Sequence, residues 1–154
     1  MKSEPEELFP LDKPKKIGLK PSKTQEVVIM VGYPGSGKSK ICGLIFEPAG
    51  YFIAHGDELK TSAKMIKASI TPITEGKSVV FDATNASKKK RAEYIEFAEK
   101  YKMPVRCVHV NTSLADSMAR NNLREKPVPR IVYNIYNKNF ETPSEDEGFT
   151  LVTI

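Results

Sequence analysis

Residues 27–39 read Val27-Val28-Ile29-Met30-Val31 and then Gly32-Tyr33-Pro34-Gly35-Ser36-Gly37-Lys38-Ser39. The first five are apolar and mostly β-branched, a pattern that predicts a buried strand. The next eight complete the pattern G-x-x-x-x-G-K-[ST], whose glycines let backbone N–H groups approach phosphate oxygens closely. Lys38 supplies a point charge and Ser39 is placed to ligate Mg²⁺, while the helix predicted to start here offers its positive end to phosphates. The stretch therefore predicts a strand leading into a nucleotide-phosphate loop formed by residues 32–39.

From residue 26 onward, short apolar runs alternate with stretches of helical periodicity, as in a parallel sheet covered on both faces. The predicted strands are residues 26–32, 51–56, 78–82, 105–110 and 149–153. The predicted helices are residues 38–46, 60–75, 87–102, 114–125 and 129–140. This pattern predicts an α/β fold of the P-loop NTPase class, with three layers and a parallel sheet of about five strands.

The chain has 154 residues, enough for one domain with its own core. Residues 1–25 are rich in Pro and Lys and are interpreted as a flexible arm or linker, which leaves residues 26–154 as the folded domain. Cys42 and Cys107 fall in a predicted helix and a predicted strand, where small buried hydrophobes are expected rather than a disulfide. No stretch resembles a signal peptide or a membrane span, so an intracellular location without membrane contact is expected, nuclear and cytoplasmic compartments both being open. The net charge of +5 favours an anionic partner.

Two acids follow predicted strands at the edge where ligands bind in open α/β sheets. Asp57 follows the second strand, where an acceptor hydroxyl would enter in line with the γ-phosphate, and is the candidate general base. Its alternative role is to cap the helix that starts near Leu59. Asp82 follows the third strand and is the candidate ligand of Mg²⁺ or of its water. His55 and His109 are interpreted as packed strand histidines.

Beyond Asp82, the sequence offers further polar groups. Thr84 and Asn85 are candidates either to bind substrate phosphate or to cap the helix that begins near Ser87. Lys88 opens the run Lys88-Lys89-Lys90-Arg91, which could contact a polynucleotide backbone or simply be a solvated helix face. Both pairs of alternatives remain open from the residues alone.

A cluster of basic residues follows the fourth predicted strand. Arg120 and Arg124 are four residues apart, so on a helix they share a face that suits a transferring phosphoryl group. We interpret residues 120–130 as a lid segment that carries both arginines as catalytic groups. The alternative is a solvated basic helix paired to Glu125 or Asp116.

With these residues identified, the chain from about Thr24 to Ile154 resembles the kinase domain of the polynucleotide kinase 3′-phosphatase family. The resemblance rests on the phosphate loop and on four further stretches with the same order and spacing. These are Ala49-Gly50-Tyr51 leading to His55-Gly56-Asp57, Phe81-Asp82-Ala83-Thr84-Asn85, Arg120-Asn121-Asn122-Leu123-Arg124-Glu125, and Tyr136-Asn137-Lys138-Asn139-Phe140-Glu141-Thr142-Pro143 with Glu147-Gly148-Phe149.

The resemblance implies that residues 26–154 are a P-loop kinase domain, adenylate-kinase-like with a helical lid, that moves the γ-phosphate of ATP to the 5′-hydroxyl of a polynucleotide. It implies ATP and Mg²⁺ at Lys38 and Ser39, and Asp57 as the group that activates the hydroxyl. The expected partner is a single strand or duplex end bearing a 5′-hydroxyl, in DNA or RNA end repair. A phosphatase domain or another repair protein in trans is a further candidate partner. Gly56 departs from the family, which usually has Arg there; Lys60 or the Lys88 cluster could compensate.

Two other functions remain open at this stage. One is a small-molecule kinase of the same fold, acting on a sugar or a nucleoside. The other is a nucleotide-binding module without transferase activity, in which Asp57 would be only a helix cap.

Overall fold

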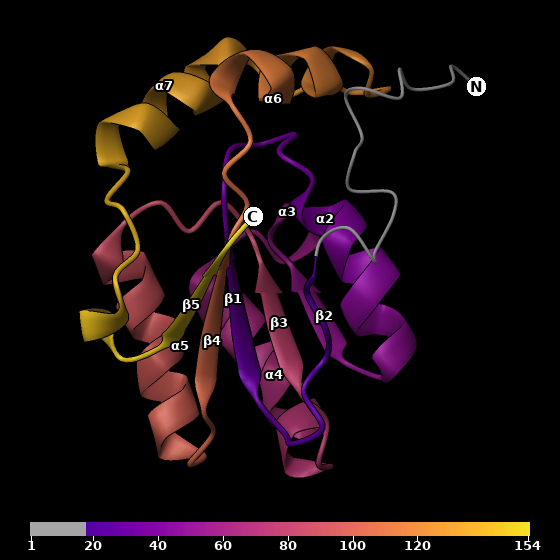
Figure 1. The fold of residues 1–154 in the computed structure, drawn as a ribbon, viewed down its shortest axis with the longest axis vertical. Helices are drawn as coiled ribbons and strands as arrows, with labels where there is room; N and C mark the ends of the chain where they lie inside the picture. The colour runs from indigo at the N-terminus through magenta and orange to yellow at the C-terminus, as the bar shows by residue number, and fades with distance from the viewer. Residues whose placement is uncertain (1–17) are drawn as a thin grey trace.

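The computed structural model describes residues 18–154 and contains a parallel sheet with the strand order β2-β3-β1-β4-β5 (Figure 1). The strands are β1 Val27–Val31, β2 Phe52–His55, β3 Val79–Asp82, β4 Val105–His109 and β5 Thr150–Thr153. Every strand lies within one residue of its predicted range at both ends, so the five-stranded, three-layer P-loop fold is confirmed.

The helices agree less closely with the sequence prediction. They are α2 Lys38–Ile41, the π-helix η3 Cys42–Phe46, the 3₁₀ turn η4 Glu47–Ala49, α3 Gly56–Leu59, α4 Ser62–Thr74, α5 Lys88–Lys100, α6 Leu114–Asn122, α7 Arg130–Asn139 and the 3₁₀ turn η5 Glu145–Glu147. The single helix predicted at 38–46 is wrong in detail, because it widens into a π-helix at Cys42. The prediction that the helix begun at Leu114 reaches residue 125 is also wrong. It ends at Asn122, where the amides of Leu123 and Arg124 bond back three residues in a tight turn.

The two faces of the sheet carry separate apolar clusters. In β1, Val27, Ile29 and Val31 pack in the cluster shared with α4 and α5, while Val28 and Met30 pack in the cluster shared with α2 and η3. All five β1 side chains are fully buried, which is why the central strand appears in the sequence as an uninterrupted apolar run. Helices thus cover both faces, and the strand ends remain for the functional residues.

Helices α6 and α7 lie across the carboxyl edge of the sheet, directly above the loop that follows β1 (Figure 1). Parallel pairing brings the last residues of neighbouring strands level, as His55 of β2 and Asp82 of β3 are direct partners. The phosphate loop, the ends of β2 and β3 and the two helices therefore surround one region.

Residues 19–25 contact the rest of the domain: Leu19 is 5% exposed and packs in the cluster of α2 and η3. Arg106 in β4 donates a hydrogen bond of 2.9 Å to the carbonyl of Lys20, and Gln25 bonds to carbonyls near the end of α4. The segment 1–17 of the arm expected from the sequence lies outside the described residues. Both cysteines are buried free thiols, as predicted.

A buried arginine joins the start of α5 to the C-terminal segment, and removing its partner carboxylate should destabilise the fold. Arg91 is fully buried and bonds Glu147 twice, at 2.9 and 3.0 Å, as well as three backbone carbonyls. Glu147→Ala would leave a buried guanidinium without its counter-charge, so we expect the free energy of unfolding to fall by about 3–5 kcal/mol. Urea unfolding measures this, with Asp146→Ala, an exposed carboxylate in the same turn, as the control. Equal small losses in both variants would contradict the prediction.

Candidate active site

The phosphate loop adopts a conformation that requires its glycines. Gly35 and Gly37 have φ values of +77° and +107°, in the region that favours glycine. A Cβ on Gly32 would lie 2.9 Å from the carbonyl oxygen of Val110, and one on Gly35 only 2.5 Å from the carbonyl oxygen of Ser117. The glycines thus serve the close approach of the loop to α6 as well as the approach of phosphate.

Lys38 is buried inside the loop. Its ammonium donates to the carbonyls of Gly32 at 2.9 Å and Tyr33 at 2.6 Å. Burial lowers the pKa of Lys38 to about 8, with nearby Asp82 opposing the shift and Arg124 adding to it. The loop therefore holds a pre-positioned cation whose charge is marginal above neutral pH.

ATP affinity should consequently fall as pH rises through 8. If only the charged lysine binds the β- and γ-phosphates, a pKa near 8 predicts that the Kd for ATP rises about tenfold between pH 7 and pH 9. Below the pKa the ammonium is present and binding is strong; above it, each binding event must take up a proton. Titration calorimetry in two buffers of different ionisation enthalpy measures both effects, and AMP, which lacks those phosphates, is the control ligand. A Kd for ATP that stays constant over this range would mean that Lys38 remains charged throughout.

Ser39 and Asp82 come together as the sequence predicted. The hydroxyl of Ser39 donates to Oδ2 of Asp82 at 2.7 Å, and the same oxygen lies 2.9 Å from Nδ1 of His55. Hydroxyl and carboxylate oxygens at the mouth of a phosphate loop are the ligands that Mg²⁺ takes alongside nucleotide phosphates, so the donor set fits this ion. Within residues 18–154, no group of three or more His, Cys, Asp or Glu side chains could hold a metal, so water molecules and phosphate oxygens would complete the coordination of Mg²⁺ here.

His55 has a role that the sequence analysis missed. It was interpreted as a packed strand residue, yet its side chain is 35% exposed and orients Asp82. The sequence carries no signal for this contact, because it depends on the pairing of β2 with β3 in the register that puts His55 level with Asp82. His109, in contrast, is buried against the ring of Phe140, as predicted.

A cleft of about 300 Å³ connects the phosphate loop to the candidate base. Its lining includes Lys38, Ser39 and Asp82, together with Asp57 from the first turn of α3 and Arg124 from the turn after α6. Among residues 18–154, no group hydrogen-bonds to the carboxylate of Asp57, and the cap of the following helix is Thr61. The capping alternative for Asp57 is therefore wrong, since α3 starts one residue before it and α4 has its own cap.

Gly56 lies against the neighbouring strand end. A Cβ there would lie 3.0 Å from the Cβ of Ala83 and 3.3 Å from the carbonyl oxygen of Asp82, so an arginine would require a local shift. Besides Lys38 and Arg124, two further cations line the same cleft, Lys60 and Lys90. Lys60 has a φ of +72°, an uncommon conformation for a residue with a side chain.

The two lid arginines occupy different environments. Arg120, in the last turn of α6, is 6% exposed and donates to the carbonyl of Ser36 at 2.8 Å. Arg124 is exposed and lines both the cleft and a smaller cavity of about 180 Å³ over the phosphate loop, where the two arginines meet. The prediction that they share one helix face is wrong, because α6 ends between them; their convergence on the loop comes from the turn.

The three candidate substrate-binding residues after β3 lie in three different environments. Thr84 lines the cleft. Asn85 is 2% exposed, with φ +45°, and its amide donates to the carbonyls of Met30 and Phe81, so it ties β1 to β3 instead of facing substrate. Lys88 lines a different cavity beside Glu96 and Glu99, and Lys90 is the lysine of this run that reaches the cleft. The cap of α5 is Ser87.

Aromatic residues of α7 hold the phosphate loop from above. The hydroxyl of Tyr33 donates to Asn137 at 2.6 Å, and the hydroxyl of Tyr133 donates to the carbonyl of Pro34 at 2.6 Å. The ring of Tyr33 also packs on Tyr136, with centroids 4.5 Å apart. The sequence analysis did not find these contacts, because the motif leaves the identity of Tyr33 and Pro34 open.

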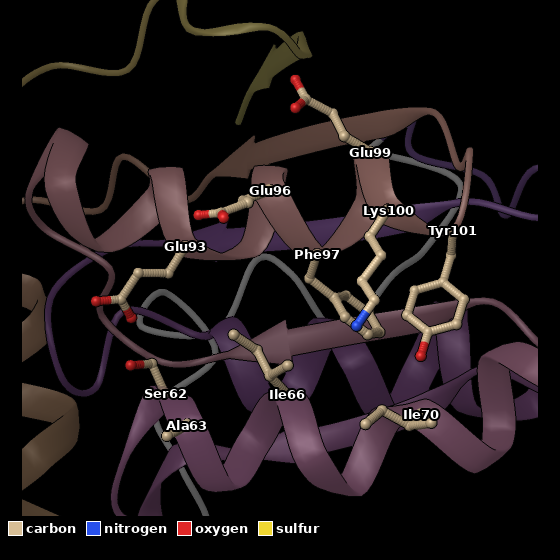
Figure 2. A pocket seen from close by; sticks show the side chains of 10 residues that line it. All are labelled: Ser62, Ala63, Ile66, Ile70, Glu93, Glu96, Phe97, Glu99, Lys100 and Tyr101. Carbon is tan, nitrogen blue, oxygen red and sulfur yellow. The ribbon is translucent and has the colours of Figure 1, made fainter.

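A larger cavity of about 790 Å³ lies between α4 and α5 (Figure 2), and among residues 18–154 Ser62 is the one residue that lines both this cavity and the cleft. Its floor is apolar, with Ile66, Ile70 and Phe97, and the carboxylates of Glu93 and Glu96 line its side. Those carboxylates would repel phosphates, so size alone does not identify the site of a phosphate-binding protein.

The five-stranded parallel sheet, the phosphate loop after β1 and the helices over its edge define a P-loop, kinase-like fold. The chain belongs to the AAA_33 family, an AAA domain whose model matches residues 59–143, more than half of the chain.

Relatives agree over a longer range. The chain is 37% identical over 140 residues to the bifunctional polynucleotide phosphatase/kinase of Schizosaccharomyces pombe, covering 86% of this chain and 34% of that protein. It is also 37% identical over 140 residues to a protein of Acanthamoeba polyphaga mimivirus assigned to the same bifunctional class, covering 84% and 32%. The chain thus spans about a third of the length of these relatives.

Solved structures share the fold at low identity. A fungal RNA kinase aligns with a TM-score of 0.63 and 13% identity, over 87% of this chain and 76% of that one. A gluconokinase from Sinorhizobium meliloti 1021 aligns with a TM-score of 0.61 and 18% identity, over 86% and 85%. The fold alone therefore does not separate a polynucleotide acceptor from a sugar.

Proposed function

We propose that this chain transfers the γ-phosphate of ATP to the 5′-hydroxyl of a polynucleotide. The observation that carries the proposal is the single cleft that Lys38 and Ser39 of the phosphate loop line together with Asp57 and Arg124. A phosphate loop by itself binds nucleotide. A carboxylate in the same cleft without a hydrogen-bond partner among the described residues adds the means to remove a proton from an attacking hydroxyl.

In the proposed reaction, the acceptor oxygen bonds to the γ-phosphorus as the bond from that phosphorus to the β,γ-bridging oxygen breaks. ADP leaves, and the acceptor proton passes to a carboxylate oxygen of Asp57. Lys38 exchanges its two carbonyl partners for phosphate oxygens, and Arg124 neutralises charge that develops on the transferring group.

Ser39 and Asp82 are the proposed holders of Mg²⁺, oriented by their mutual hydrogen bond and by His55. The chemistry this ion supplies when bound is neutralisation of charge on the phosphate oxygens. Arg120 acts less directly in this proposal, because it holds the carbonyl of Ser36 and so fixes the loop.

The acceptor class is supported by the relatives, both of which carry names that specify polynucleotide, and by the net charge of +5. DNA or RNA end repair is the process that such a transfer serves. A phosphatase domain, or another repair protein in trans, is the partner we propose for it. No helix within residues 18–154 has the length and apolar character to cross a bilayer.

The test is transfer of labelled γ-phosphate, with Mg²⁺, to an oligonucleotide that bears a 5′-hydroxyl, beside the same strand already 5′-phosphorylated. We expect label on the first strand alone. Label on a free nucleoside or sugar but not on the oligonucleotide would favour a small-molecule kinase. Binding of ATP without transfer to any acceptor would favour a nucleotide-binding module and overturn the proposal.

A further inference from the structure

A second cavity, which we call the α5–α7 groove, continues from the cleft. It has a volume of about 710 Å³ and lies between the start of α5 and the outer side of α7. Thr84, Lys90 and Val132 line both spaces, so the groove adjoins the cleft that Asp57 also lines. A chain attached to the acceptor nucleotide could therefore leave the cleft through this groove.

The groove is positively charged. Lys89 and Lys90 of α5 and Lys138 of α7 line it, all exposed, against one carboxylate, Glu141. The carboxylate of Glu141 accepts a hydrogen bond of 3.2 Å from the backbone amide of Lys88. Within residues 18–154, none of the three lysines takes part in an ion pair.

Two of these lysines also oppose the local electrostatics of the fold. Lys89 and Lys90 lie in the first turn of α5, where the helix dipole disfavours cations. A run of cations at the start of a helix lowers the stability of that helix, and such local costs are commonly found at functional sites. An anionic partner in the groove would offset that repulsion.

The part of the groove formed by α7 also carries apolar side chains. Ile135 lines the groove and is 52% exposed, and the rings of Tyr136 and Phe140, which line it too, stack with centroids 5.3 Å apart. Exposed cations and an exposed apolar side chain in one groove match the two parts of an unpaired strand, its phosphates and its bases. In a duplex the bases are paired and stacked, so they are not free to contact Ile135, whereas the bases of a single strand are.

We propose that the α5–α7 groove holds, as an unpaired strand, the nucleotides that follow the accepting 5′ nucleotide. This inference rests on the proposed kinase function. It makes Lys89, Lys138 and Ile135 residues that determine specificity for acceptors with a free single-stranded 5′ end.

The test compares the double variant Lys89→Gln/Lys138→Gln with Lys64→Gln/Lys67→Gln, which removes two exposed lysines of α4. Binding of 3′-fluorescein oligonucleotides of about 12 nucleotides is measured by anisotropy, with a non-hydrolysable ATP analogue present. At low salt we expect the groove variant to bind the single strand about tenfold more weakly. The slope of log K against log salt should become shallower by about 1.4, which is 0.7 per phosphate contact for a single strand. The α4 variant should match the unmodified chain.

Two further measurements separate the possible outcomes. The KM for a nucleoside 3′-monophosphate acceptor should not change in the groove variant, and Ile135→Ala should weaken strand binding severalfold at an unchanged salt slope. Equal loss for the mononucleotide and the strand, an unchanged salt slope, or equally tight binding of a blunt duplex would overturn the inference. Anisotropy needs no turnover, so the two claims can fail separately. Strand binding that depends on Lys89 and Lys138, without phosphate transfer, would refute the kinase function but support strand binding in the groove. Phosphate transfer with strand binding that does not depend on these lysines would support the kinase function but refute strand binding in the groove.

Discussion

Asp57→Asn should lower kcat for phosphate transfer to a 5′-hydroxyl by about 10²–10⁴-fold while the Kd for ATP stays the same. The amide keeps the size of the side chain but cannot accept the proton of the attacking hydroxyl. Asp57 lines the cleft and makes no hydrogen bond among residues 18–154, and its charge acts on Lys38 only through space, so its replacement by the isosteric amide should not disturb the fold. Single-turnover transfer, with ATP binding measured separately, gives both quantities.

Glu58→Gln is the matched control for Asp57→Asn. Glu58 is the next residue of α3, is exposed and does not line the cleft, so its variant should retain full activity. Retention of normal turnover by Asp57→Asn would remove Asp57 from the mechanism, and thermal unfolding of both variants verifies that the fold is intact.

Arg124→Ala should reduce kcat by about 10²–10³-fold with a small change in the KM for the acceptor. Arg124 lines both the cleft and the cavity over the phosphate loop, so its guanidinium can contact the transferring group from above. A contact that strengthens as charge develops affects turnover more than binding. Arg124→Lys should restore only part of the rate, because an ammonium cannot form two parallel hydrogen bonds.

The control for this variant is Arg130→Ala, an exposed arginine in the first turn of α7 that lines neither the cleft nor the cavity over the loop. Turnover of this variant should be normal. An increase in acceptor KM with unchanged kcat in Arg124→Ala would assign Arg124 to acceptor binding instead of catalysis.

The strands could be predicted to within a residue because a parallel strand buried on both faces has a simple sequence pattern, a short run of apolar residues such as Val27–Val31. Their ends also located Asp57 and Asp82, since parallel strands deliver their carboxyl ends to one edge. The π-helix at Cys42–Phe46 and the four-residue α3 were beyond reach. The first differs from an α-helix only in its hydrogen bonds, and the second is too short to have a period.

Side-chain direction was the main source of error in the candidate site. Lys88 and Lys90 are two residues apart near the start of α5, which on a helix turns them to opposite sides, so only Lys90 lines the cleft. Residue type did not show that Thr84 lines the cleft while Asn85 is buried. The difference depends on which of the two side chains points under the edge of the sheet, where the amide of Asn85 bonds to the carbonyls of Met30 and Phe81. The burial of the Arg120 side chain beneath the phosphate loop could not be predicted either, since it depends on how α6 packs on the loop and where that helix ends.

The phosphate loop of this chain is held by contacts with segments far along the sequence. Its motif leaves four positions free, yet each of the four residues contacts a later segment of the chain. The contacts are Tyr33 with Asn137, Pro34 with Tyr133, Gly35 with the backbone of Ser117, and Ser36 with Arg120 and Thr112. Tyr33 and Asn137 are 104 residues apart in the chain. The carbonyls of Pro34 and Ser36 would be offered by any residue, but the contacts of Tyr33 and Gly35 depend on the side chain or on its absence. A loop taken from another kinase with other residues at these two positions would therefore lose the hydrogen bond to Asn137 and collide with the backbone of Ser117.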